Sequence, residues 1–232
     1  TIPGAGTSLP LGGHKNGMIF RDTSHGWIGG DTPADGFVYL YSTTDSGVTW
    51  SQQALVLPAG YESAFVITNA PIFFGANDDV LPVWLGTNTG KDLFIYTSHN
   101  GGVTWTVSSA FARAGENADF VSLNDSFSWD WANLFHVTND SGNSWKQVIP
   151  NVDFSNDFCG MDFVSTTTGW VIQNVVNGVT PLYRTNDGGA TWTLLSGMAT
   201  AQAPTATPTL PSGPSPSEFG QTVVNTLNAK NF

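Results

Sequence analysis

The sequence predicts an all-β protein made of repeated four-stranded antiparallel units, and two observations carry this prediction. An eight-residue pattern of turn formers that ends in Thr-Trp or Ser-Trp occurs four times along the chain. Short apolar runs of strand-forming residues stand before and after each copy. A repeat on this scale indicates one supersecondary unit per copy, and each unit must bury its apolar face against the next.

Each of the four copies is predicted to be the loop of a β-hairpin. The copies are Thr43–Trp50, Ser98–Trp105, Thr138–Trp145 and Thr185–Trp192. In every copy an Asp or Asn can accept bonds from backbone N–H groups ahead of it, and a Gly takes a positive φ without steric cost. The residues predicted to build these turns are Thr43, Asp45, Gly47, Trp50, Ser98, Asn100, Gly102, Trp105, Thr138, Asp140, Gly142, Trp145, Thr185, Asp187, Gly189 and Trp192.

The other strands of each unit follow in a constant order. A first hairpin joins an apolar strand to a strand that bears Trp, and a loop then leads to the third strand, the octapeptide and the fourth strand. The first hairpins are predicted at 20–27, 74–84, 120–129 and 163–170. The third strands are predicted at 37–41, 93–96, 134–137 and 182–183. The longest interval between octapeptides is assigned an extra loop at 57–71. Four strands over roughly 40–50 residues match one blade of a β-propeller.

The octapeptides resemble Asp boxes, the S/T-x-D-x-G-x-T-W motif of the sialidase-type (BNR) β-propellers. Four matches in phase make the resemblance specific, although Asn100 stands at the Asp position of the second copy and Ser144 replaces Thr in the third. The segment Leu182–Trp192 is similar to the repeat of the photosystem II assembly factor type of propeller. The resemblance covers about residues 16–196. It implies a propeller with four recognisable blades, alone or within a ring of about six to eight blades.

The two ends of the chain differ from the blades. Residues 16–198 are predicted to form the propeller, and residues 1–15 the exit strand of a preceding or closing blade. The alternative for Thr1–Pro10 is a mature N-terminus that carries a proline. The Pro/Thr/Ser-rich residues 199–216 predict an extended linker.

Residues 217–232 predict a short terminal helix, either a docking tail or the first helix of a further domain. Ser215 is a candidate N-cap, and Glu218 lies in the first turn. The apolar residues on one helical face are Phe219, Val223, Val224 and Leu227.

Composition excludes several classes of function. The chain of 232 residues carries 7 basic and 18 acidic side chains and a net charge of −11. Phosphate binding needs clustered Lys and Arg, so neither nucleic acid nor a polybasic membrane contact is expected. No apolar stretch is long enough to insert into a membrane. A high content of Thr, Ser, Asn, Gly and Trp is typical of an extracellular or cell-surface bacterial β protein. Cys159 is alone and is predicted to be a buried small residue.

A sialidase-type active site is not expected. The family's catalysis needs three arginines around the substrate carboxylate, a Tyr–Glu nucleophile pair and an acid/base Asp. The chain has three arginines in total. Arg184 lies on the strand that enters an octapeptide, Arg113 lies in a loop, and Arg21 follows Phe20 in a first strand. Tyr61 and Glu62 are adjacent, so strand geometry would point them to opposite faces. The chain is therefore predicted not to be a true sialidase.

No metal or cofactor site is expected, and one aromatic pair is a candidate platform. His14, His25, His99 and His136 share no metal-ligand spacing. Trp129 and Trp131 alternate along one strand, so both could face one side. They are interpreted either as core residues covered by a neighbouring blade or as a binding platform for a sugar or a protein.

These observations predict a non-catalytic extracellular or cell-surface propeller that serves as a binding, structural or assembly module. The expected partners are other protein subunits or a surface glycan. Open strand edges and the C-terminal tail also favour a homo-oligomer or filament. Two alternatives remain. One is a fragment of a secreted sialidase-like glycoside hydrolase whose catalytic residues lie outside this stretch, and the other is a protein-complex assembly factor.

Overall fold

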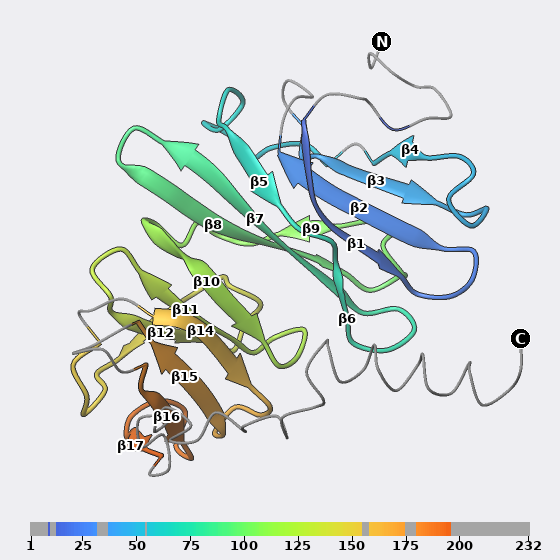
Figure 1. Cartoon of the computed structure of the whole chain (residues 1–232). Helices are drawn as coiled ribbons and strands as arrows, with labels where there is room; N and C mark the ends of the chain where they lie inside the picture. Colours follow the sequence, from blue (N-terminus) through green and yellow to red (C-terminus); the bar gives the residue numbers. More distant parts are fainter. Residues whose placement is uncertain are drawn as a thin grey trace, which may run out of the picture. The chain divides into compact units, whose positions relative to one another are not determined.

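The computed structural model describes most of the first 195 residues (Figure 1). The described residues are 9, 13–31, 37–53, 55–154, 158–174 and 180–195. The chain divides into two compact units, Thr1–Leu195 and Ser196–Phe232, and all described residues belong to the first. The predicted linker and terminal helix lie outside the described residues, as does most of the predicted exit strand at 1–15.

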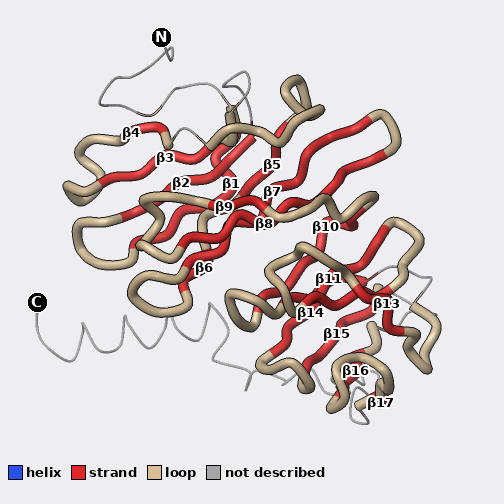
Figure 2. Tube along the Cα trace, turned by 180° about the vertical axis from the view of Figure 1, so that it is seen from behind, coloured by secondary structure: helices blue, strands red, loops and turns tan. Residues whose placement is uncertain are grey.

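The described residues form seventeen β-strands, which pair antiparallel. Figure 2 shows the described part of the chain as strands and loops, with no helix. The prediction of an all-β protein is confirmed. The strands follow one another as four hairpin-linked groups, which we call blades 1 to 4. Neighbouring strands within each blade are antiparallel, and several of them, such as β2 (Gly26–Asp31) and β7 (Asp79–Thr87), are buried on both faces.

Blade 1 consists of β1 (His14–Phe20), β2 (Gly26–Asp31), β3 (Leu40–Thr43) and β4 (Ser51–Gln52). These strands pair in sequence order, with Phe20 opposite Gly26 and Trp27 opposite Ser42. The strand β2 is glycine-rich where it meets blade 2. A side chain at Gly29 would overlap the backbone of Asn69, so this glycine permits the close approach of the two chain segments.

Blade 2 consists of β5 (Val66–Thr68), β6 (Ile72–Phe73), β7 (Asp79–Thr87), β8 (Gly90–Ser98) and β9 (Thr106–Val107). The strands β5 and β6 both pair with β7 and together replace one continuous strand. The break between them includes Pro71 and lies opposite Pro82 of β7, which has no N–H to donate to a ladder.

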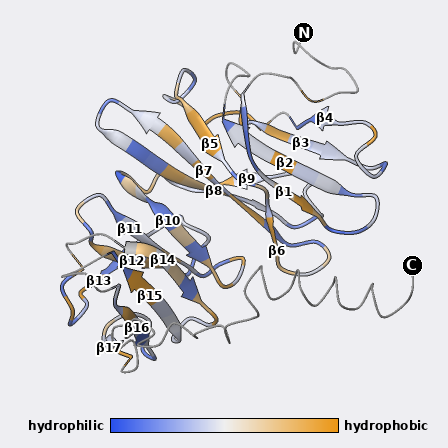
Figure 3. Ribbon diagram, in the orientation of Figure 1, coloured by the Kyte–Doolittle hydropathy of each residue, from blue (hydrophilic) through white to orange (hydrophobic). Residues whose placement is uncertain are grey.

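The extra loop predicted at 57–71 is therefore wrong in part. Its second half contains β5, which is coloured strongly hydrophobic in Figure 3. Val66 is buried in the core between blades 1 and 2. In addition, Asp31 of β2 pairs with Ile67, so blades 1 and 2 share one nine-stranded sheet instead of two separate ones. The turn formers of this stretch concealed a short strand whose burial depends on a neighbouring blade.

Blades 3 and 4 are separate four-stranded sheets. Blade 3 consists of β10 (Ala114–Phe120), β11 (Ser126–Asp130), β12 (Phe135–Thr138) and β13 (Lys146–Val148). Blade 4 consists of β14 (Phe158–Phe163), β15 (Gly169–Gln173), β16 (Leu182–Thr185) and β17 (Thr193–Leu194). Each sheet keeps the strand order of the sequence.

The core lies between consecutive blades. One cluster, which includes Trp27 and Phe94, joins blades 1 and 2. Two clusters around Trp84 and Phe120 join blades 2 and 3, and the cluster around Phe135 joins blades 3 and 4. Among the described residues, no core cluster, ring contact or hydrogen bond joins blade 1 to blade 4. Among the described residues, blades 2 and 3 therefore each contact the preceding blade with one face and the following blade with the other.

Candidate functional site

The four octapeptides close the hairpins between the third and fourth strands of their blades. In the fourth, Thr185 Oγ1 donates to Asp187 Oδ1 at 2.8 Å and accepts from the Gly189 N–H at 3.0 Å. The carboxylate of Asp187 also accepts from the backbone N–H of Thr191 at 2.8 Å and from the Thr191 hydroxyl. The Trp192 indole N–H donates to the Gly189 carbonyl at 2.8 Å. The acidic side chain is thus fully engaged within its own loop.

The second octapeptide keeps this geometry with an amide in place of the carboxylate. Asn100 Oδ1 accepts from Ser98 Oγ at 3.0 Å and from the Thr104 N–H at 2.9 Å. Its Nδ2 donates to Thr104 Oγ1 at 2.8 Å, whereas in the other copies the hydroxyl at that position donates to the carboxylate. The exchange of Asp for Asn therefore reverses one hydrogen bond and preserves the turn.

Three of the octapeptides contain a titrating carboxylate whose pKa is held low. Hydrogen bonds from the side chain and backbone of Thr49, Ser144 and Thr191 lower the pKa of Asp45, Asp140 and Asp187 respectively. A carboxylate that accepts several hydrogen bonds favours its ionised form. We call such a group a turn clamp, a carboxylate that is bonded within its own loop and stabilises the turn. Because its pKa is lowered, it stays ionised at neutral pH and does not donate a proton.

Replacing Asp187 with alanine is expected to lower the free energy of unfolding by about 1–2 kcal/mol at pH 7, through lost hydrogen bonds within the loop. Because the folded-state pKa is lowered, this stabilisation exists above the ordinary value of 3.8 and is lost as the pH falls through the folded-state pKa. Urea titrations at neutral and acidic pH would measure the difference. An undiminished difference in strong acid would contradict a carboxylate clamp. The matched control is Asp187→Asn, which introduces the amide that the second octapeptide carries at Asn100.

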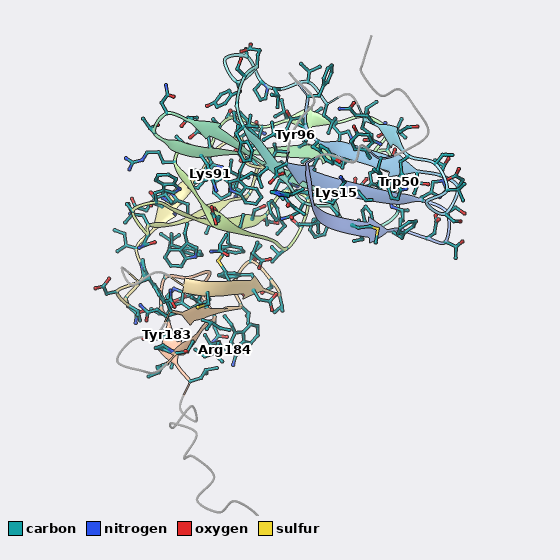
Figure 4. All side chains as sticks on the ribbon, turned by 45° about the horizontal axis from the view of Figure 1, so that its top comes forward. Lys15, Trp50, Lys91, Tyr96, Tyr183 and Arg184 are labelled. Atoms are coloured by element: carbon teal, nitrogen blue, oxygen red, sulfur yellow. The ribbon has the colours of Figure 1, made fainter. Side chains whose placement is uncertain are left out.

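A cleft of about 950 Å³ lies where blade 1 meets blade 2, beside their octapeptides. Its lining includes Arg21, Asp22, Trp27, Gln53, Tyr96 and Trp105. Tyr96 comes from β8, as labelled in Figure 4, and its hydroxyl donates to the Val56 carbonyl at 3.0 Å. The Trp105 indole donates both to Gly102 O at 3.1 Å and to Gln53 Oε1 at 3.0 Å, which ties the second octapeptide to blade 1.

Three exposed valines flank this cleft. Val56 follows blade 1 and is 68% exposed, while Val103 and Val107 belong to blade 2 and are 76% and 43% exposed. Aliphatic side chains at such exposure in one cleft present an apolar contact surface to solvent. Sequence reasoning missed this cleft, because Val56 and Val103 are separated by 47 positions (103 − 56) and neither belongs to an unusual motif.

A buried ion pair supports the floor of the cleft. The guanidinium of Arg21 pairs with Asp79, which is the first residue of β7 and is 0% exposed. The same guanidinium lies over the rings of Trp27 and Phe73, at 5.0 and 4.4 Å from their centroids. Burial raises the pKa of Asp79, and the bond and charge of Arg21 oppose this shift. Arg21 Nε, Asp79 Oδ2 and Trp27 Nε1 are buried without a hydrogen-bond partner.

Comparison with solved structures places this geometry in a known fold. The chain is similar to the GH74 enzyme of Niastella koreensis, with a TM-score of 0.51 and 19% identity over 81% of this chain and 30% of that enzyme. The fold is that of a β-propeller. The chain is also similar to YCF48 from Cyanidioschyzon merolae (TM-score 0.47, 16% identity, 81% and 57% of the two chains) and to YCF48 bound to a D1 peptide (TM-score 0.41, 15% identity, 80% and 82%).

The chain spans less than a third of the GH74 enzyme's length. No protein-family model matches it, and no curated protein matches it in sequence. The similarity to the GH74 enzyme thus identifies the architecture of the blades and leaves their chemistry to be argued from their own side chains.

The other arginines of the propeller lie apart from Arg21. Arg113 adopts a positive φ of 53°, and its backbone N–H donates to Asp92 at 2.8 Å. Arg184 stands on β16 with its guanidinium 5.5 Å from the Trp170 ring centroid, and Figure 4 labels it beside Tyr183. Among the described residues, no hydrogen bond or ion pair brings any two of the three arginines to one partner.

Tyr61 and Glu62 also have separate local partners. The Tyr61 hydroxyl donates to Asp92 at 2.6 Å, and this bond raises the pKa of Tyr61 to about 12. The Glu62 carboxylate accepts the Gly60 N–H at 3.0 Å. Ionisation of Tyr61, which a nucleophilic phenol requires, is disfavoured in this setting.

The structure places Trp129 and Trp131 in different surroundings. Trp129 is 1% exposed and packs against Phe135 and Phe154 in the core between blades 3 and 4. Trp131 follows the end of β11, is 50% exposed and lies against Gly90 of β8. The two indoles therefore do not form one exposed surface, because β11 ends at Asp130, whose carboxylate accepts two backbone N–H groups and turns the chain.

The prediction that Cys159 is buried is wrong. Cys159 is a free, exposed thiol at the bulge where the pairing of β14 with β15 shifts between Phe158 and Gly160. Bulge residues fall outside the alternation of the strand, so an apolar neighbourhood in sequence does not predict their burial.

The described residues offer neither a metal centre nor a membrane-spanning helix. No group of three or more His, Cys, Asp or Glu among them lies close enough together to hold a metal ion. The described part of the chain also has no helix with the length and apolarity needed to span a membrane.

Proposed function

We propose that this propeller is a non-catalytic binding module that holds an extended aliphatic segment of a partner protein in the cleft between blades 1 and 2. The observation that carries this proposal is the set of exposed valines, Val56, Val103 and Val107, at a cleft of about 950 Å³. That volume is near the upper end of small-molecule pockets, so it suits several residues of a peptide.

The chemistry of the cleft favours a peptide over a sugar. Sugar recognition relies on exposed aromatic faces. Here Trp27 and Tyr96 are buried, and Trp105 is partly buried, with its N–H donated to Gln53 and Gly102. The exposed contact groups are aliphatic instead. Side chains such as Thr44 and Asn77 line the same cleft and can bond to a partner's backbone.

The titratable groups of the cleft support a non-catalytic function. Arg21 is paired with Asp79, and Asp22 is paired with His25 at 2.9 Å. Backbone N–H groups of Ser24 and His25 lower the pKa of Asp22. A general acid in hydrolysis needs a carboxyl pKa near the working pH, which Asp22 does not have. A glycosidase alternative would require catalytic residues from outside this stretch.

The net charge of the chain favours some partner segments over others. At a net charge of −11, the protein attracts basic segments and repels acidic ones at long range. We place the protein at the cell surface or outside the cell, because its few charged residues and its many Thr, Ser and Asn side chains suit such an environment. An assembly function for a larger protein complex is compatible with the same cleft.

Panning a random peptide library against the purified protein is expected to enrich peptides with aliphatic residues. Val103→Glu should weaken their binding at least about tenfold in calorimetry, because it places a charge in the contact. The matched control is Val164→Glu, whose valine is 66% exposed on the hairpin of blade 4 and off the cleft. Absence of enrichment, or equal binding by both variants, would refute the peptide site. Turnover of fluorogenic sialosides or glucosides would refute the non-catalytic function.

A further inference from the structure

The contact between blades 3 and 4 consists of two surfaces, a receiving one on blade 3 and an inserting one on blade 4. The same two surfaces recur on the far face of blade 4 and on the near face of blade 1. Phe163 of β14 stacks on Phe127 of β11 with ring centroids 3.6 Å apart. The indole of Trp129 contacts the sulfur of Met161 at 3.3 Å. The carboxylate of Asp119 accepts the backbone N–H of Phe163. Blade 3 thus receives blade 4 through two aromatic residues and one carboxylate.

The far face of blade 4 repeats this receiving surface, and no described residue of another blade packs on it. In blade 3, Asp119 pairs with Phe127 across β10 and β11; in blade 4, Asp162 pairs with Trp170 across β14 and β15. Two residues beyond Trp170, at the place of Trp129, stands Ile172, which is 39% exposed. Asp162 is also exposed. The same pattern that is buried at one interface is therefore open to solvent on the next blade.

The near face of blade 1 repeats the inserting surface of blade 4. Met18 and Phe20 hold the register positions in β1 that Met161 and Phe163 hold in β14. The rings of Phe20 and Phe163 each lie over the glycine opposite, Gly26 or Gly169. Met18 is 64% exposed and Phe20 is 38% exposed, whereas Phe163 is only 4% exposed.

We propose that a second copy of this chain docks head to tail, with Met18 and Phe20 of one copy on Trp170 and Ile172 of the other. Asp162 accepts the Phe20 N–H of the second copy, as Asp119 accepts that of Phe163. The occupant is argued from continuity with the interface between blades 3 and 4, whose two surfaces recur at opposite ends of the series. Such a heterologous contact closes a ring of copies or extends a filament.

Two variants distinguish this contact from its alternatives. Met18→Glu removes the inserting surface and leaves the receiving one intact, and Ile172→Glu does the reverse. Each alone is expected to sediment as a 24.7 kDa monomer, with the dissociation constant raised about a hundredfold by an unpaired charge in the contact. An equimolar mixture of the two is expected to form a single 1:1 dimer, because one intact surface of each kind remains.

The affinity of the two variants for each other can be measured with a label on a native cysteine. A fluorophore on the exposed Cys159 of Ile172→Glu, whose receiving face is already disabled, reports binding of unlabelled Met18→Glu by anisotropy. Asp162→Ala in the Met18→Glu copy should weaken this binding about tenfold through the lost charge-assisted bond. Ile149→Glu is the matched control, because Ile149 is 80% exposed on blade 3 and touches neither face.

Each outcome supports or overturns the proposal. Assembly of the wild type and of Ile149→Glu, with monomeric single variants and a dimeric mixture, supports it. A monomeric wild type overturns it. If Met18→Glu or Ile172→Glu alone still assembles, the proposal is also overturned, because the head-to-tail contact needs both surfaces. Assembly lost in only one of them would indicate a contact that uses a single surface twice. Circular dichroism of every variant confirms that the blades are folded.

Discussion

Replacing Arg21 with methionine is expected to lower the free energy of unfolding by about 3–5 kcal/mol at neutral pH, because it leaves Asp79 charged and unpaired in the interior. Asp79 is 0% exposed, and one of its carboxylate oxygens already lacks a partner. Methionine retains most of the packing of Arg21 on Trp27 and Phe73, so the loss reports the charge. Urea unfolding followed by tryptophan fluorescence measures it.

The effect of Arg21→Met should depend on pH with a defined sign. Burial raises the pKa of Asp79 above its ordinary value of 3.8 even beside Arg21. A raised folded-state pKa contributes stability that is present in acid and is lost as the pH rises through that pKa. Without the opposing guanidinium the shift is larger, so the deficit of the variant grows from about pH 4 to neutrality.

The double variant Arg21→Met, Asp79→Ser is the control for this prediction. Serine is the residue that blade 3 places at the equivalent register position, Ser126. Removing both charges should recover a large part of the lost stability. A single variant that loses less than about 1 kcal/mol, or a loss independent of pH, would show that the pair is not electrostatically coupled.

Gly189→Ala in the fourth octapeptide is expected to lower the free energy of unfolding by about 2–5 kcal/mol, the sum of backbone strain and overpacking. Gly189 has a φ of +94°, which alanine adopts only at a cost. An added Cβ would also overlap the ring of Phe135, which is 0% exposed among Phe127, Trp129 and Trp192. A densely packed core cannot shift this ring without moving its neighbours.

Gly60→Ala separates the two causes. Gly60 has a similar φ of +89°, but a Cβ there would meet no atom within 4 Å. This variant should therefore show only the strain of the backbone, about 1–2 kcal/mol. Thermal and urea unfolding of both variants provide the comparison. Equal losses for Gly189→Ala and Gly60→Ala would show that the ring of Phe135 can move aside.

Short-range chemistry made part of this protein readable from its sequence. The loops at 43–50, 98–105, 138–145 and 185–192 are closed by bonds between residues at most four positions apart. The pairing of Phe163 with Gly169 likewise follows from one tight hairpin. Patterns of this kind carry their own hydrogen bonds, so a single copy suffices to specify the turn and four copies specify the repeat.

Features that depend on packing between blades were not readable in the same way. The strand β5 looked like loop, because its burial comes from blade 1 and its pairing from β7. Cys159 was predicted to be buried, but it lies at a bulge, where the alternation of the strand does not hold, and it is exposed. Arg21 was assigned to a first strand, directly after Phe20, but its partner Asp79 lies 58 positions away. Nothing in either local sequence indicates the other.

By itself, the sequence determined the all-β class, the hairpin order and the positions of the turn clamps, because each depends on contacts within one blade. Only the tertiary structure decided which faces are covered and where a cleft opens. Trp27 and Trp170 both follow a glycine at the start of a second strand, yet Trp27 is buried and Trp170 is only partly buried. The reason is physical: burial is set by the neighbouring blade, and blade 4 has none on its far side among the described residues.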